Sequence, residues 1–221
     1  MTATILTADQ EQVLALLAAD RPIAHAFYLS GGTALAEYYL HHRLSEDLDF
    51  FSEQEVDTEG ISARLKSIQT PAGIRRITFE QSFNRNLFFL ELDNSTIKTE
   101  FTFYPFPRIE QGRKVGALAI DSLLDIAVNK IFTIYQKPRS RDFIDLFCIL
   151  QKQTEWTLDA LIEKAQIKFD YYVDPIQLAG QYVKSKTLKD YPTLRITLNE
   201  KTWQNFFMQE AEKLAAKQLS Q

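Results

Sequence analysis

The sequence predicts an α+β protein, in which a mixed sheet with flanking helices is followed by a helical C-terminal region. Three observations lead to this class. Residues 26–52 follow the order strand, Gly-Gly-Thr turn, helix, strand; residues 74–104 hold alternating segments typical of antiparallel strands; and helical patterns prevail from residue 121 onward. We therefore expect a sheet domain at residues 1–118 and a helical region at residues 119–221.

The expected elements of the sheet domain follow from spacing. Apolar residues three and four positions apart predict helices, and short apolar or alternating runs predict strands. Pro71 ends one helix, and Pro105 and Pro107 end the last strand. In chain order we expect a helix at 8–20, a strand at 26–30, a helix at 32–42, a strand at 47–52, a helix at 58–68 and strands at 74–81, 86–93 and 96–104.

The second part of the chain carries helical signals separated by turn residues. Pro138, the run DYYVDP and the stretch DYPTLRITLN provide the breaks. The expected helices lie at 121–136, 141–153, 157–169, 175–185 and 199–218.

The composition is that of an ordinary globular protein, with 45% hydrophobic residues and a mean hydropathy of -0.22. No apolar run reaches the roughly 18 residues of a membrane span, and the N-terminal residues lack the parts of a signal peptide. We expect a cytoplasmic protein with no membrane contact. The formal net charge of -4 argues against a dedicated nucleic-acid binder, although Lys130, Lys137, Arg139 and Arg141 form a local basic cluster.

An acidic pair is the strongest chemical signal. Asp47 and Asp49 lie two positions apart on an expected strand, where side chains alternate, so both carboxylates point to one face. Such a pair suits Mg²⁺, which prefers oxygen ligands and binds together with phosphates. The sequence therefore predicts a magnesium site at Asp47 and Asp49.

A phosphate-binding turn is expected just before this pair. Gly31 and Gly32 let the backbone approach a ligand closely, and the following helix offers its N-terminal N–H groups to an anion. A phosphate-binding turn and a metal pair in one compact unit are the minimum equipment for handling a nucleoside triphosphate.

These motifs resemble a known family. Gly32-Thr33 followed by Asp47-Leu-Asp49 resembles the signature of polymerase-β-like nucleotidyltransferases, and GGTALA…HRLSEDLDFF, with Lys130 and RSRDFIDL later, resembles the AbiEii/AbiGii-type nucleotidyltransferase toxins. The resemblance covers roughly residues 27–150. It implies a polymerase-β-like mixed sheet whose active site is completed by the helical region.

The resemblance also implies the metal chemistry. Asp47 and Asp49 would hold Mg²⁺ in a two-metal site that bridges the triphosphate and the attacking oxygen. A third carboxylate usually comes from a neighbouring strand. Glu100 shares one face of strand 96–104 with Lys98, Thr102 and Tyr104 and is the expected third ligand, with Asp93 as the alternative at a strand end.

Nucleotide-binding roles follow for the residues around the acidic pair. The resemblance assigns Gly31, Gly32 and Thr33 to the nucleotide, and it favours phosphate contacts for Arg43 and Ser45. The alternative for Ser45 is a turn or cap hydroxyl, and for Arg43 an exposed surface charge.

Two further catalytic candidates lie in the helical region. Lys130 borders an apolar stripe, from which its ammonium would reach the triphosphate; the alternative is a lysine extending from the surface. Asp142 opens the next helix and is either an active-site acid or a partner of the helix dipole. Asp145 is an i,i+3 neighbour of Asp142 and forms a possible bridge to Arg141.

The function implied is transfer of a nucleoside monophosphate from an NTP to an acceptor hydroxyl, by the toxin of a toxin–antitoxin pair. The expected partners are NTP, the end of a tRNA or another RNA, and a cognate antitoxin protein. One rival is a nucleotidyltransferase that modifies a small molecule or a protein side chain. Another is a catalytically silent partner-binding module, against which the intact Asp47 and Asp49 argue.

Overall fold

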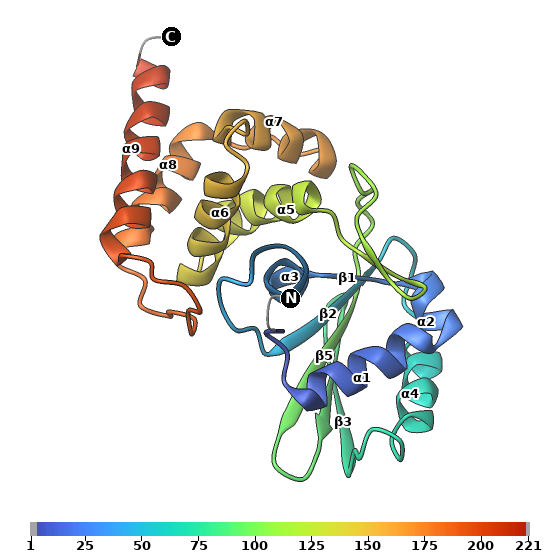
Figure 1. Ribbon diagram of the computed structural model, residues 1–221. Coiled ribbons are helices and arrows are strands. Elements are labelled where there is room, and N and C mark those ends of the chain that lie inside the picture. Colours follow the sequence, from blue (N-terminus) through green and yellow to red (C-terminus); the bar gives the residue numbers. More distant parts are fainter. Residues whose placement is uncertain (1–3, 220–221) are drawn as a thin grey trace. The chain divides into compact units, whose positions relative to one another are not determined.

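The computed structural model describes residues 4–219, with side chains to residue 217 (Figure 1). The chain divides into two compact units, with the division between Ser122 and Leu123. The division lies slightly beyond the boundary expected after residue 118, because the short strand β7 (Leu118–Ile120) pairs with β1 (Tyr28–Ser30) and so belongs to the sheet unit.

The first unit is built on a mixed sheet with the strand order β3-β4-β5-β2-β1-β7-β6. β2 runs parallel to β5 and antiparallel to β1, while β3, β4 and β5 form an antiparallel meander. The remaining strands are β2 (Asp47–Ser52), β3 (Arg76–Ser82), β4 (Arg85–Glu91), β5 (Thr96–Phe103) and β6 (Lys114–Val115).

Helices border this sheet, as Figure 1 shows for α1 and α4. Both begin at a side-chain cap, Thr7 for α1 and Asp57 for α4, which satisfies a backbone N–H of the first turn. The helices of the unit are α1 (Ala8–Ala19), α2 (Arg21–Ala26), α3 (Gly31–Leu35), which continues as a π-helical turn at Ala36–Leu40, and α4 (Thr58–Ser67).

One face of the sheet forms the core of this unit. Phe50 on β2 stacks on Phe101 on β5 with ring centroids 4.9 Å apart, and Phe88 on β4 meets Phe101 edge-on. The hydroxyl of Thr58 donates to Asn86 on this same face, which places the start of α4 there. The opposite face carries the polar residues of β2 and β5.

The second unit is helical. Its elements are α5 (Leu123–Gln136), α6 (Ser140–Lys152), α7 (Leu158–Phe169), α8 (Pro175–Val183), a 3-10 turn at Lys184–Lys186 and α9 (Glu200–Leu219). Phe143 of α6, Tyr182 of α8 and Phe207 of α9 pack as a buried aromatic cluster. Figure 1 shows α8 and α9 side by side. Among the described residues, no helix combines the length and apolar character needed to cross a membrane.

Candidate active site

Strand β2 presents the acidic pair on the polar face of the sheet. Leu48 and Phe50 are fully buried, whereas Asp47 and Asp49 are partly exposed on the opposite side. The predicted alternation along this strand is therefore confirmed. Burial of the apolar residues fixes the register, because a shift of one position would bury both carboxylates.

Gly31 lies against the carboxylate of Asp49. Its φ is +70°, in the left-handed region, and a Cβ at this position would overlap Oδ2 of Asp49. β1 and β2 pair so that Ser30 faces Asp49, which brings the turn after β1 against the acidic pair. Only glycine meets both conditions, the backbone conformation and the close approach.

Gly32 lies against Arg43 and Ser45. A Cβ on Gly32 would collide with the guanidinium of Arg43 and would lie 3.1 Å from Oγ of Ser45. Arg43 is 2% exposed and donates from Nη1 to the carbonyl of Leu44 at 2.9 Å, so the surface-charge alternative for Arg43 is wrong. The structure thus brings a cationic group and a hydroxyl to the glycine turn.

The segment that carries Arg43 and Ser45 is held from α1. Nε2 of Gln10 donates to the backbone carbonyls of Ser45 and Glu46 at 3.0 and 2.9 Å. The hydroxyl of Thr33 donates to the backbone carbonyl of Asp47, and Thr33 is fully buried. Thr33 therefore fastens the start of β2 to the first turn of α3, and its nucleotide contact stays a prediction.

Lys98 on β5 neutralises one member of the acidic pair. β2 and β5 are parallel, with Asp47 opposite Lys98 and Asp49 opposite Glu100. Nζ of Lys98 lies 2.8 Å from Oδ2 of Asp47, and both side chains are about a quarter exposed (26% and 28%). The sequence placed Lys98 on the face of Glu100 but gave it no role.

Glu100 is bound by an arginine. Nε and Nη2 of Arg85 donate to its two oxygens at 2.6 and 2.5 Å, and the hydroxyl of Thr102 donates at 2.8 Å. Burial raises the pKa of Glu100, but the hydrogen bonds from Arg85 and Thr102 outweigh that effect and leave the pKa below its usual value. Glu100 is thus an ionised carboxylate next to Asp49.

Asp93, the alternative third carboxylate, lies between β4 and β5. It pairs with Arg75, and both side chains are about two-thirds exposed. The structure places Glu100, and not Asp93, beside Asp49.

The site fits a magnesium ion held by two carboxylates. No group of three or more His, Cys, Asp or Glu side chains within the described residues is arranged to hold a metal ion. Mg²⁺, however, is commonly bound by one or two carboxylates together with waters and substrate phosphates. Asp47 and Asp49, on one face and next to a glycine turn, meet that requirement. The third ligand, Glu100, stays a prediction.

A buried hydrogen-bond network, which the sequence gave no signal for, braces the glycine turn. Oγ of Ser30 donates to Oδ2 of Asp121 at 2.7 Å, and the hydroxyl of Tyr39 donates to the carbonyl of Asp121 at 2.8 Å. Asp121 follows β7, so this network joins the ends of β1 and β7. Ser30 and Tyr39 lie 91 and 82 residues from Asp121 in the chain. Local residue spacing does not predict contacts over such separations.

In the helical unit, Lys130 and two aspartates form a buried triad. Nζ of Lys130 lies 2.8 Å from Oδ1 of Asp142 and 2.6 Å from Oδ2 of Asp145, and both carboxylates are fully buried. The alternative of a lysine extending from the surface is therefore wrong. Asp145, given only a possible bridge to Arg141 by the sequence, is a partner of Lys130.

Asp142 also caps helix α6. Its carboxylate accepts the backbone N–H of Arg139 at 3.2 Å and Nε of Arg139 at 3.0 Å. Burial raises the pKa of Asp142, but Lys130 and Arg139 outweigh it and hold the pKa below its usual value. Asp142 is thus a structural cap as well as a catalytic candidate.

Comparison with known proteins identifies the family. The model of the family "Nucleotidyl transferase AbiEii toxin, Type IV TA system" matches residues 13–219. The chain belongs to this family. As an AbiEii-type protein it is a nucleotidyltransferase, which confirms the enzyme class and the family resemblance read from the sequence.

The AbiEii-type chain is similar to one curated protein in sequence and to solved structures in fold. Protein aq_aa25 of Aquifex aeolicus (strain VF5) is 33% identical over 158 residues, covering 68% of this chain and 71% of the relative. The crystal structure of JHP933 from Helicobacter pylori has a TM-score of 0.58 at 20% identity and covers 95% of this chain and 91% of its own.

A second H. pylori crystal structure, described as that of a candidate nucleotidyltransferase, has a TM-score of 0.59 at 20% identity and covers 96% and 97% of the two chains. At this identity the two structures show the fold alone. The predicted fold class is confirmed.

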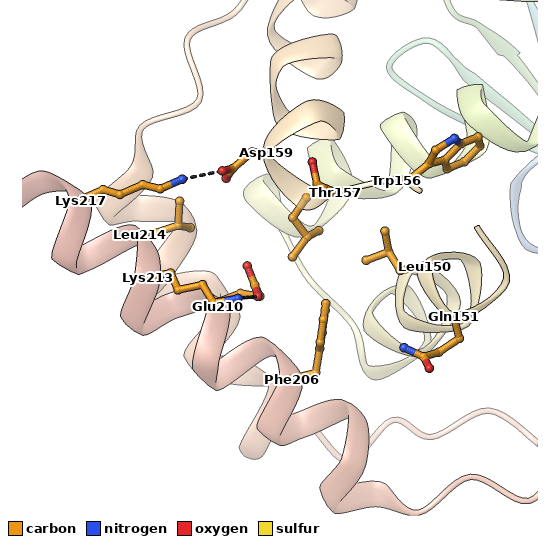
Figure 2. A pocket seen from close by; sticks show the side chains of 11 residues that line it. Leu150, Gln151, Trp156, Thr157, Asp159, Phe206, Glu210, Lys213, Leu214 and Lys217 are labelled. Atoms are coloured by element: carbon orange, nitrogen blue, oxygen red, sulfur yellow. Dashed lines mark hydrogen bonds and ion pairs between the residues drawn. The ribbon is translucent and has the colours of Figure 1, made fainter. Parts of the chain in front are cut away.

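The helical unit of the AbiEii-type chain has a cavity of about 350 Å³ between α6, the start of α7 and α9. Figure 2 shows Leu150, Phe206 and Leu214 facing it, with Lys217 reaching Asp159 at the rim. Neither Lys130 nor Asp142 lines this cavity, so it adds nothing to the predicted catalytic residues.

Proposed function

We propose that this AbiEii-type nucleotidyltransferase transfers a nucleoside monophosphate from an NTP to a hydroxyl of an RNA acceptor, in the first place the end of a tRNA. The acceptor oxygen forms a bond to the α-phosphorus, the bond from that phosphorus to the bridging β-oxygen breaks, pyrophosphate leaves, and the hydroxyl proton passes to solvent or a base. The observation that carries the proposal is the acidic pair on the polar face of β2, in contact with the glycine turn.

Asp47 and Asp49 would hold Mg²⁺, which supplies charge neutralisation for the reacting phosphates and lowers the pKa of the attacking hydroxyl. The chain itself positions the substrate. Gly31 and Gly32 bring backbone close to a phosphate, and Arg43 and Ser45 lie against that turn. Positioning and charge stabilisation are the main sources of rate in this class of reaction.

Lys130 and Asp142 are proposed to act on the triphosphate as a unit. An ammonium has three N–H donors, and Asp142 and Asp145 take two of those of Lys130. The remaining donor and the fixed position suit a phosphate oxygen. The two aspartates hold the ammonium of Lys130 in place.

We further propose that the enzyme is the toxin of a toxin–antitoxin pair, as the description of its family states for the family. Expression should arrest growth of a host cell, whereas a variant without Asp47 and Asp49 should not. Co-expression with the cognate antitoxin should restore growth. Equal growth with the wild type and the variant would overturn the toxin proposal.

The transfer itself is tested by incubation of the protein with each labelled NTP, Mg²⁺ and total cellular RNA. Labelled RNA that disappears when EDTA is added supports the proposal. Phosphate contacts release counterions, so labelling should fall steeply with added salt. The net charge of -4 does not by itself support RNA binding. Label on a protein or on a small molecule, and none on RNA, would establish the rival acceptor.

A further inference from the structure

An arginine that the proposed mechanism does not use lies beside the acidic pair, on the side away from the glycine turn. In the strand order β4-β5-β2-β1, the turn follows β1, whereas Arg85 begins β4. The registers place Arg85 opposite Thr102, and Glu100 opposite Asp49. Arg85, Glu100 and Asp49 therefore share one face of the sheet.

The buried carboxylate of Glu100 holds Arg85 in place, while the Arg85 side chain extends toward solvent. The Glu100 side chain is 7% exposed and that of Arg85 is 50% exposed. Nε and Nη2 of Arg85 donate to the two carboxylate oxygens of Glu100, and the hydroxyl of Thr102 donates to Oε1 of Glu100. Nη1 of Arg85 receives no hydrogen-bond partner from any residue that the structure describes. The charges of Asp49 and Asp47 act on Arg85 as well, raising its pKa after the larger effect of Glu100.

We propose that Arg85 binds a phosphate group of the acceptor RNA and that Glu100 is the positioning residue that holds it for this purpose, an inference that rests on the proposed transfer to RNA. A guanidinium presents planar paired donors that match phosphate oxygens. The nucleotide phosphates are assigned to the turn on the β1 side of the acidic pair, which leaves the β5–β4 side to the acceptor.

This role competes with the predicted role of Glu100 as third metal ligand. Glu100 already accepts three donors, two from Arg85 and one from Thr102. Mg²⁺ does not need a third carboxylate when phosphates and waters complete its shell. A metal at Glu100 would have to displace a charge-assisted bidentate pair, the strongest kind of side-chain hydrogen bond.

The test measures binding of a single-stranded oligoribonucleotide by fluorescence anisotropy over a salt series, without metal. We expect Arg85→Met to weaken binding and to lower the slope of log K against log salt by about 1, the loss of one phosphate contact. Arg85→Lys should keep that slope but bind less tightly. In Glu100→Gln the amide can accept only part of the guanidinium contact, so this variant should also bind RNA less tightly. Loss of a negative charge alone would have the opposite effect and strengthen RNA binding.

Arg76→Met is the matched control. Arg76 and Glu91 form the same kind of bidentate pair, with contacts of 2.6 to 3.0 Å, at the other end of β4. Its removal changes the net charge equally and should leave the salt slope unchanged. Equal effects of Arg85→Met and Arg76→Met, tighter RNA binding by Glu100→Gln, or no RNA binding by the wild type would each overturn the inference.

Two further measurements separate the remaining explanations. NTP affinity should be equal in the wild type and both Arg85 variants; a loss confined to NTP would assign Arg85 to the nucleotide instead. If Glu100 is a metal ligand, Glu100→Gln should raise the Mg²⁺ concentration for half-maximal transfer and Arg85→Met should lower it. Absence of transfer by the wild type would refute the proposed function, while the binding series would still decide the role of Arg85.

Discussion

At the scale of single residues, the acidic pair gives the most direct prediction. Asp47→Asn or Asp49→Asn should reduce transfer below detection, because each removes a metal ligand and with it charge neutralisation worth several kcal/mol in the transition state. Both side chains are partly exposed, so thermal unfolding should change little. The measurement is turnover of labelled NTP beside a melting curve.

Glu46→Gln is the control for this pair, because Glu46 is an exposed carboxylate adjacent to Asp47. It should retain full transfer. Well-folded Asp47 and Asp49 variants with wild-type turnover would refute the assignment of the site.

Gly31 gives a second prediction. Gly31→Ala carries two costs: strain of about 1 kcal/mol for an alanine at positive φ, and displacement of the Asp49 carboxylate, which lies where the methyl group would be. We expect a small loss of stability and a complete loss of transfer.

Gly73→Ala isolates the first cost. Gly73 has a φ of +67°, close to that of Gly31, and a Cβ there meets nothing within 4 Å. This variant should show the same small loss of stability with full transfer. An active Gly31→Ala variant would show that Asp49 does not need its observed position.

At the scale of elements, helices α5 and α6 are joined by the triad of Lys130, Asp142 and Asp145. Lys130→Met removes the ammonium that pairs with the buried carboxylates of Asp142 and Asp145, and loss of one partner of a buried ion pair typically costs about 3–5 kcal/mol. Lys130→Arg keeps the charge but not the geometry of an ammonium, so it should recover most of the stability and little of the transfer.

Chemical denaturation and turnover, measured on both variants, check this prediction. Lys164→Met, at an exposed position of α7, should match the wild type in both assays. If Lys130→Arg restored full transfer, the position would require only positive charge.

The sequence predicted the elements that have strong local signals. β2 has the expected bounds, Asp47–Ser52, because alternation and a turn define it locally. The helix α2 (Arg21–Ala26) was missed, although Asp20 as cap and Pro22 in the first turn were signals for it. The strands β6 and β7 have two and three residues, too few to show a period, and β7 exists because β1 offers a parallel edge.

The contacts within the site could likewise be predicted only where they follow from the local sequence pattern. The shared face of Asp47 and Asp49 follows from alternation alone. That Arg85 binds Glu100 follows from the register of β4 on β5, a diagonal pair that the sequence does not specify. The burial of Arg43 and Lys130 depends on tertiary packing around them. Local sequence patterns therefore could not exclude a surface position for either side chain.

At the scale of the whole molecule, the buried carboxylates predict sensitivity to acid. The pKa values of Glu100 and Asp142 are lowered in the folded state. Their contribution to the free energy of unfolding is therefore fully present at a pH above the pKa values of the unfolded state, about 4. It is lost as the pH falls through the lower pKa values of the folded state.

The difference in unfolding free energy between the wild type and Asp142→Asn tests this dependence. It should be constant above about pH 5 and shrink as the pH falls below about 4. A difference that stays the same down to pH 3 would show that the charge of Asp142 does not contribute to folding.

The overlap between position 31 and the Asp49 carboxylate also constrains how such chains diverge. A side chain at position 31 and an acid at position 49 exclude each other in this backbone. Descendants that keep the reaction must therefore keep the glycine. In a lineage that has lost Asp49 the steric overlap no longer applies, and only the positive φ at position 31 still favours glycine. Replacement of this glycine in a relative would then mark an enzyme that no longer works, even where the rest of its sequence is preserved.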